Sequence, residues 1–260
     1  MSSQRATQPT THDLLAGKSV VITAAAGTGI GFATARRCIE EGARVMISDS
    51  HERRLGEAIE RLKPLSAFPV LGQPCDVTKE DQVQALLGAA IEAFGSVDVV
   101  VNNAGLGGYA PLLEMDDEQW QRVLDVTLTG TMRMTRAAFK HMLPRRQGAI
   151  VNNASVLGWR AQEGQSHYAA AKAGVMALTR CSAMEAAAAG VRVNAVAPSL
   201  AMHAHLAKVT PDGLLQRLQE REAFGRAAEP AEIANVIVFL ASDLASYMTG
   251  EVVAVSSQHA

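Results

Sequence analysis

Residues 19–31, SVVITAAAGTGIG, decide the fold of this chain. A run of β-branched residues ends in a turn with three glycines, and a helical pattern follows to about Glu41. Glycines let a backbone approach a pyrophosphate, and the helix N-terminus offers that anion free N–H groups and partial positive charge. The spacing is GxGxG rather than GxGxxG, and a plain tight connection is the alternative, but the strand–turn–helix order favours a dinucleotide site. The predicted cofactor-binding residues here are Gly27, Thr28, Gly29, Ile30 and Gly31.

Short apolar runs and longer helical stretches continue to alternate along the chain. The predicted strands span 44–48, 97–101, 149–152, 191–196 and 252–255, and one more ends at 75–77. The predicted helices span about 53–61, 83–94, 118–143, where Pro144 stops the helix, and 166–189, where Gly190 does. Repeated β-α-β units with apolar strands form a parallel sheet with helices on both faces. We expect a flexible segment at 1–13 and one α/β domain at 14–260, with a doubly wound sheet of about seven strands.

Composition and charge exclude several function classes. The chain has 260 residues, 48% of them hydrophobic, and a formal net charge of -2, so we expect a globular protein that does not bind nucleic acid. No apolar run approaches the roughly 18 residues of a membrane span, and the N-terminus lacks an apolar signal core, so we expect a cytoplasmic protein without membrane partners. Three scattered cysteines without CxxC spacing favour neither a disulfide framework nor a metal site.

Acidic residues at two predicted strand ends are candidates for contact with an adenosine. Asp49 closes the second strand, where a carboxylate accepts hydrogen bonds from ribose hydroxyls and repels a 2′-phosphate. This favours NAD over NADP, although Arg53 and Arg54 nearby can offset the repulsion. Asp76, with Val77 beside it, ends the third strand and is a candidate for contact with the adenine, the alternative being a helix cap.

The fourth predicted strand ends in the sequence Asn102-Asn103-Ala104-Gly105. Small residues there permit close approach of a cofactor, while the asparagine side chains are equally suited to tie neighbouring strands together. Asn103, Ala104 and Gly105 are therefore further candidates for cofactor contact.

The candidate catalytic residues are Ser155, Tyr168 and Lys172. Tyr168 and Lys172 are four residues apart in a helical pattern and share a face. An ammonium beside a phenol is expected to lower the phenol pKa from its ordinary value of about 10, which makes it a usable acid or base. Ser155 directly follows the fifth predicted strand, where its hydroxyl is placed to hydrogen-bond a substrate oxygen.

Together these motifs resemble the classical short-chain dehydrogenase/reductase family over about residues 14–256. The resemblance rests on TAAAGTGIG, NNAG, Ser155 with the YAAAK motif at 168–172, and FGRAAEPAEIANVIVFLASDLASYMTGE. It implies a Rossmann-type sheet, a homotetramer or homodimer, and hydride transfer between NAD(P) and a carbon bearing oxygen. It also implies nicotinamide contacts by Tyr168, Lys172 and the loop after the sixth strand, with Pro198 and Ala201.

VVITAAAGTGIGFATARR, ISDSHERRLGE and VNNASVLGWRAQ are similar to a narrower, actinobacterial-type subgroup of that family tied to steroid ring degradation. Its members act on a hydroxylated bicyclic indane remnant of the C and D rings, carried as a CoA thioester. The resemblance implies the same substrate class here. Two alternatives stay open: a 3-oxoacyl-thioester reductase using NADPH, and a nucleotide-binding sensor without turnover.

The chain departs from the family pattern in four places. The glycine turn is one residue longer, with Ala24 or Ala25 where the first glycine is expected, and Thr127 stands in place of an asparagine of the catalytic tetrad. The usual PGxxxT after the sixth strand is the segment 198–203, PSLAMH, and the terminal DGG is SSQ at 256–258. We therefore expect a catalytic triad and not a tetrad.

Trp159 and Arg160 are the candidate substrate residues besides Ser155 and Tyr168. An aromatic ring beside a guanidinium suits a ring system with an anionic or CoA group, and loop packing is the alternative. His167 is interpreted as structural or exposed, since its helical position points away from the Tyr–Lys face. Segment 197–209 is interpreted as either a substrate-covering lid or an ordinary helix.

Overall fold

The computed structural model describes residues 12–202 and 213–257, and within them seven parallel strands form one sheet in the order β3-β2-β1-β4-β5-β6-β7. The strands are β1 (Ser19–Ile22), β2 (Arg44–Asp49), β3 (Leu71–Pro74), β4 (Val99–Asn102), β5 (Ala149–Asn153), β6 (Arg192–Pro198) and β7 (Val252–Val255). The strand order reverses between β1 and β4, which is where doubly wound sheets bind their ligands. The predicted Rossmann-type, single-domain architecture is confirmed.

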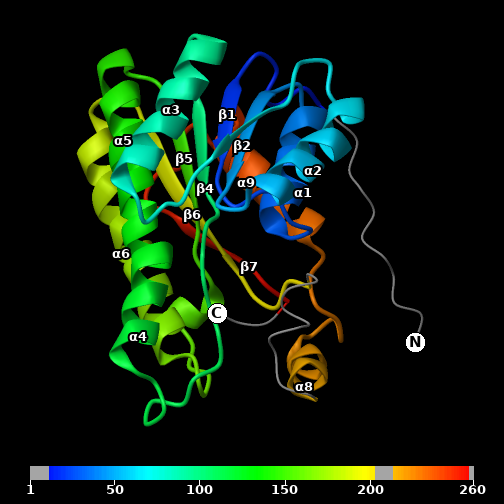
Figure 1. The fold of residues 1–260 in the computed structure, drawn as a ribbon, viewed down its shortest axis with the longest axis vertical. Coiled ribbons are helices and arrows are strands. Elements are labelled where there is room, and N and C mark those ends of the chain that lie inside the picture. The colour runs from blue at the N-terminus through cyan, green and yellow to red at the C-terminus, as the bar shows by residue number, and fades with distance from the viewer. Residues whose placement is uncertain (1–11, 203–212, 258–260) are drawn as a thin grey trace.

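Helices cover both faces of the sheet. The helices of the described residues are α1 (Ile30–Glu40), α2 (Glu52–Leu62), α3 (Glu80–Phe94), α4 (Asp117–Leu124), α5 (Gly130–Arg145), α6 (Ser166–Ala187), α8 (Leu214–Arg221) and α9 (Pro230–Ala241), with short 3-10 turns at Lys63–Leu65, Val156–Gly158 and Asp243–Ala245. Figure 1 shows α1, α2 and α9 on one side of the sheet and α3, α5 and α6 on the other. In the part of the chain that the structure describes, no helix combines the length and apolarity needed to cross a membrane.

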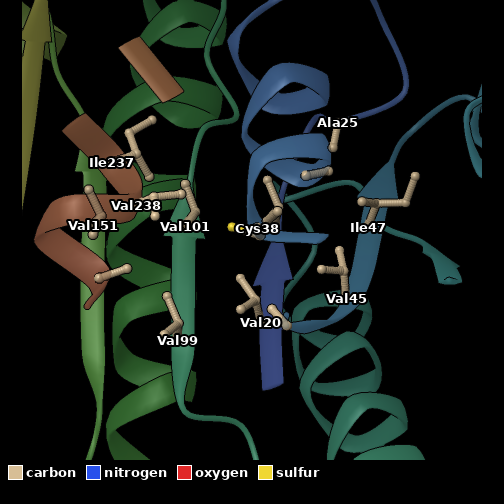
Figure 2. Close-up of a cluster of buried hydrophobic side chains, with 14 of the residues drawn as sticks. Val20, Ala25, Cys38, Val45, Ile47, Val99, Val101, Val151, Ile237 and Val238 are labelled. Carbon is tan, nitrogen blue, oxygen red and sulfur yellow. The ribbon is translucent and has the colours of Figure 1, made fainter. Parts of the chain in front are cut away.

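Alternate residues of β1 feed the two halves of the core. Val20 and Ile22 pack in a cluster with residues of α1, α2 and α9, and Figure 2 shows Val20 in that cluster with Cys38 of α1, whereas Val21 packs with α3 and α5. All three are fully buried, and each such side chain contributes about 1.5–3 kcal/mol on leaving water. Cys38 of α1 packs in the first half as a small apolar side chain, and burial raises the pKa of its thiol to about 12. Packed side chains therefore cover both faces of β1, the strand that leads into the glycine turn.

Strand β3 ends earlier than the predicted 75–77. The N–H of Cys75 still donates to the carbonyl of Asp49, but the next residue turns the chain away. The Asp76 carboxylate accepts hydrogen bonds from the backbone N–H and the hydroxyl of Thr78, at 2.9 and 2.8 Å. Such a local turn satisfies the backbone without a strand partner, and α3 begins only at Glu80.

The prediction of one helix over 118–143, stopped by Pro144, was wrong in two respects. The segment Asp125–Thr129 is π-helical and separates α4 from α5, and α5 runs through Pro144 to Arg145. Proline keeps a helical φ and lacks only its own N–H, so in the last turn it costs a single hydrogen bond. The helix ends instead at Arg145, because the next residue, Arg146, takes the left-handed conformation with a φ of 53°.

Buried Glu41 anchors the N-terminal end of the described chain. Its carboxylate accepts hydrogen bonds from the backbone N–H groups of His12 and Leu14, at 3.0 Å each, and from Arg37 at 2.5 Å. Glu41 is fully buried, and these partners hold the pKa of its carboxyl below the ordinary value although burial opposes them. The predicted flexible segment lies mostly outside the described residues, as does 203–209 of the predicted lid.

Candidate functional site

The carboxyl ends of β1, β4, β5 and β6 open into one cavity of about 810 Å³. Most of the predicted site residues line it: Gly27, Thr28, Gly29, Ile30, Gly31, Asp49, Asn103, Gly105, Ser155, Arg160, Tyr168, Lys172, Pro198 and Ala201. Four do not line it, namely Asp76, Val77, Ala104 and Trp159. The topology thus brings together residues from 27 to 201 that the sequence places far apart.

Close backbone packing shapes the glycine turn. A Cβ at Gly31 would lie 2.5 Å from both the carbonyl oxygen of Ala24 and Nδ2 of Asn103, so only glycine fits there. The residue of this turn that takes the left-handed conformation is Ala24, with φ 51°, one of the two alanines that are candidates for the family's first glycine position. Helix α1 has neither a side-chain cap at Gly29 nor an acidic residue in its first turn. Its N-terminal N–H groups therefore remain available to an anion.

The Asp49 carboxylate lies against this turn. Its Oδ2 accepts a hydrogen bond from the N–H of Ala26 at 3.4 Å, and its Oδ1 accepts one from the N–H of His51 at 3.0 Å. Arg54 lies 3.5 Å away, and it opposes the burial that raises the pKa of Asp49. Arg53, the other predicted neighbour, instead pairs with exposed Glu57 at 2.7 Å.

A ladder of amides connects the glycine turn to the middle of the sheet. Nδ2 of Asn103 donates to the carbonyls of Thr23 and Ala24 at 3.1 and 3.0 Å, and Oδ1 of Asn103 accepts from Nδ2 of Asn153 at 2.9 Å. The Thr23 hydroxyl accepts hydrogen bonds from the N–H groups of Asn103 and Ala104. Asn103 therefore has the strand-tying role that the sequence allowed, and it also lines the cavity.

Ser155, Tyr168 and Lys172 meet at the far end of that ladder. Ser155 follows β5 and is nearly buried, while Tyr168 and Lys172 project from the first turns of α6. Nζ of Lys172 donates to the carbonyl oxygen of Asn153 at 2.5 Å and lies 5.5 Å from the centroid of the Tyr168 ring. The three predicted catalytic side chains therefore line one wall of the cavity.

Burial dominates the acid–base properties of the pair. It raises the pKa of Tyr168 to about 12, with the Ser155 hydroxyl acting in the opposite direction, and it lowers the pKa of Lys172 to about 8. The expectation that Lys172 lowers the tyrosine pKa is therefore wrong for the protein without ligands. The reason is that removal from water disfavours the charged form of each group.

Thr127, which replaces the usual asparagine, is buried behind this wall. Its hydroxyl donates to the carbonyl of Leu106 at 3.1 Å and accepts from the N–H of the same residue at 2.9 Å. Gly105 and Gly107 flank Leu106, and a Cβ on either would lie 3.3 Å from Lys172 Nζ or from the Tyr168 ring, respectively. Thr127 thus fixes a loop that packs against the catalytic pair.

The remaining candidates occupy several environments. Nδ1 of buried His167 accepts from the N–H of Tyr168, in agreement with its structural interpretation. Arg160 lines the cavity, whereas Trp159 is 44% exposed and does not. Asp76 is engaged by Thr78, and Val77 is buried against Gly130, so their adenine contact stays a prediction.

Sequence reasoning missed Glu222, which is buried and lines the cavity beside β6. It follows a short polar helix, and nothing local in the sequence distinguishes it from its exposed neighbours. His203, which stands at the threonine position of the PGxxxT segment, lies outside the described residues. Over 12–202 and 213–257, no group of three or more His, Cys, Asp or Glu side chains is arranged to hold a metal.

Comparison with known proteins agrees with this geometry. The family model described as enoyl-(acyl carrier protein) reductase matches residues 24–257, nearly the whole described chain. The chain is a short-chain dehydrogenase/reductase. It is 61% identical, over 95% of both chains, to a Mycobacterium tuberculosis (strain ATCC 25618 / H37Rv) protein named (5R,7aS)-5-hydroxy-7a-methyl-1-oxo-2,3,5,6,7,7a-hexahydro-1H-indene-carboxyl-CoA reductase.

Two further similarities support an oxidoreductase of this family. The short-chain dehydrogenase/reductase is 43% identical to the cis-4-hydroxycyclohexanecarboxylate dehydrogenase of Sinomonas cyclohexanicum, over 91% of this chain and 94% of the relative. It superposes on the crystal structure of a short chain dehydrogenase from Mycobacterium smegmatis with a TM-score of 0.88 and 57% identity, over 99% of both chains.

Proposed function

We propose that this enzyme transfers a hydride between NAD(H) and a secondary alcohol or ketone on a CoA-linked bicyclic ring, an intermediate of steroid degradation. The observation that carries the proposal is the convergence of Ser155, Tyr168 and Lys172 in a cavity that begins at the glycine turn. The 61% identity with the indane-carboxyl-CoA reductase supports the substrate class.

The cavity fits a nicotinamide dinucleotide at both ends. Gly27 leaves space for a ligand, since only the N of Gly29, at 3.9 Å, lies within 4 Å of a Cβ built on it. The open N-terminus of α1 suits the pyrophosphate, Asp49 suits the ribose diol, and the loop with Pro198 and Ala201 lies toward the nicotinamide end. When bound, the cofactor supplies or accepts the hydride.

Each catalytic side chain has a distinct task at the substrate oxygen. The neutral Tyr168 phenol donates a proton to the oxygen in ketone reduction and takes it back in alcohol oxidation. The Ser155 hydroxyl hydrogen-bonds the same oxygen. Lys172 places its ammonium group beside the Tyr168 ring. Together with the positive charge of a bound oxidised nicotinamide, this ammonium favours the phenolate form of Tyr168.

Cofactor choice rests on Asp49. Its carboxylate is nearly buried beside Ala26 and has Arg54 on only one side. A 2′-phosphate placed there would be repelled, which supports NAD over NADP. Arg160 on the cavity wall is placed to bind an anionic part of the substrate, and Trp159 is retained as a candidate for its rim.

The test is turnover of candidate alcohols followed by NADH absorbance. We expect oxidation of a CoA-linked hydroxy-indane with NAD, and Tyr168→Phe should lower kcat by about 10²–10⁴. Absence of NADH with every CoA-linked ring alcohol would refute the substrate class.

The two alternatives have separate signatures. Preference for NADPH and acetoacetyl thioesters would instead identify a 3-oxoacyl-thioester reductase. Binding of NADH without turnover, unaffected by Tyr168→Phe, would indicate a sensor.

A homotetramer or homodimer acting in the cytoplasm completes the proposal. Met184 and Tyr247 have large apolar side chains with exposed fractions of 79% and 104% in the single chain. Exposed apolar side chains of this kind are typical of surfaces that become buried between subunits. Light scattering of the purified chain measures the number of copies.

A further inference from the structure

Helix α8 forms part of the cavity wall, yet none of its residues is buried. Leu214, Leu218 and Arg221 line the cavity. The hydrogen bonds that the structure gives for the described residues 214–221 all stay within 213–222. Figure 1 shows α8 apart from the helices that cover the sheet. Packing and hydrogen bonding within the helix therefore do not hold it in place.

Glu222, directly after α8, connects it to the sheet. It is 6% exposed, and its Oε2 accepts hydrogen bonds from the hydroxyls of Ser199 at 3.1 Å and Ser257 at 2.8 Å. Ser199 directly follows β6, and Ser257 lies two residues beyond β7. Both serines stand where the family pattern has glycine, so two of the departures noted in the sequence meet at one carboxylate.

The serine side of this contact is fixed independently. The N–H of Ser199 donates to the carbonyl of Val255 at 3.2 Å, and the N–H of Ala228 donates to that of Leu200 at 2.8 Å. Hydrogen bonds from hydroxyls to a carboxylate are stronger than those between neutral groups. The contact therefore joins a helix with few other ties to a rigid part of the sheet.

We propose that Glu222 is a positioning residue that holds α8 against the ends of β6 and β7, and thereby sets the wall on which the substrate packs. The role in substrate binding rests on the proposed function, since it takes the cavity as the place of the ring substrate. Glu222 acts through the position of α8 and touches none of the catalytic triad, so it governs substrate affinity and not the proton transfer.

Hydrogen exchange of the protein without ligands tests the anchor. Glu222→Ala should speed amide exchange in 214–221 about tenfold or more, because the two charge-assisted bonds are lost, and leave the amides of α9 unchanged. Ser199→Ala with Ser257→Ala should have the same effect, and the triple variant should exchange no faster than Glu222→Ala alone. Glu220→Ala is the matched control, because among the described residues the side chain of that exposed neighbour hydrogen-bonds to Gln216 of the same helix and not to the sheet.

Steady-state kinetics test the consequence for the substrate. Glu222→Ala should raise KM for the alcohol about tenfold while kcat changes less than about threefold, and Glu222→Gln, which keeps an acceptor oxygen, should recover part of the loss. Unchanged exchange and KM in a folded Glu222→Ala protein would overturn the proposal, as would additive effects in the triple variant. If Glu222→Ala does not fold, the serine double variant decides by the same measurements. If Glu222→Ala exchanges faster but the unmodified chain oxidises no alcohol, the anchor stands and the proposed function alone is refuted.

Discussion

Replacing two glycines of the same turn with alanine should separate folding from cofactor binding. In Gly31→Ala the new methyl would lie 2.5 Å from the Ala24 carbonyl oxygen and from Asn103 Nδ2, about 0.9 Å inside ordinary contact. In Gly27→Ala the nearest atom would be 3.9 Å away, and the methyl would project where the cavity opens. The first change therefore strains the protein, whereas the second occupies only the space of a ligand.

The sizes of the two effects follow from these distances. Overpacking of this kind costs about 1–3 kcal/mol, and a chain of this length loses about 2–4 °C of Tm per kcal/mol, so Gly31→Ala should melt about 2–12 °C lower. Gly27→Ala should melt within about 1 °C of the unmodified chain but bind NADH about tenfold more weakly.

Calorimetry and NADH fluorescence on the purified variants measure both quantities. Gly56→Ala in α2, where a Cβ meets nothing within 4 Å, controls for the general effect of alanine in a helix. Equal melting of Gly31→Ala and the unmodified chain would refute the packing argument. Unchanged NADH affinity in Gly27→Ala would refute the placement of the dinucleotide at this turn.

Three further changes probe strain and buried charge. Ala24→Gly should raise the free energy of unfolding by about 0.5–1 kcal/mol in urea titrations, since φ 51° strains alanine and not glycine, and a loss of stability would contradict this. In the unmodified chain, Tm should rise with pH between about 8 and 10.5, because buried Lys172 loses its proton at a lower pH in the folded chain than in the unfolded chain. Lys172→Met should abolish turnover and remove this rise in Tm. A rise that persists in the variant would argue against burial of the lysine. Burial and Arg145 lower the pKa of His141, whose Nε2 accepts a hydrogen bond from the N–H of Val97. The stability of the folded chain should therefore fall as pH drops below 6.5. His141→Gln should make that fall smaller, which Tm measured between about pH 5 and 7 would show.

Local patterns were sufficient for most of the sheet and for the catalytic wall. Helices cover both faces of the strand segments Val20 to Ile22 and Val99 to Val101, so both segments are wholly apolar. An apolar run of this kind can be recognised from the amino-acid sequence alone. Tyr168 and Lys172 were predictable because helical spacing alone places them on one face. Two predictions failed for local reasons. Hydrogen bonds from Thr78 to the Asp76 side chain form a turn where a strand was predicted, and α5 continues through Pro144, a residue type that usually ends a helix.

Long-range contacts explain what the sequence could not show. Ser199 and Ser257 appeared only as two unrelated departures from a pattern, since their common partner, Glu222, follows a separate helix. The pKa shift of Tyr168 was predicted from the neighbouring charge of Lys172 alone. Burial instead sets the direction of the pKa shift at both residues, and helical spacing does not reveal burial.

The placement of β4 beside β1 also has a consequence for synthesis of the chain. The carbonyls of Thr23 and Ala24 accept hydrogen bonds from Asn103, which accepts one in turn from Asn153. While a ribosome has released only β1, β2 and β3, the glycine turn lacks these partners and one edge of β1 is open. A nascent chain should therefore gain affinity for a nucleotide only after about residue 153 has emerged, so its growing N-terminal half is exposed to chaperones with no ligand to stabilise it.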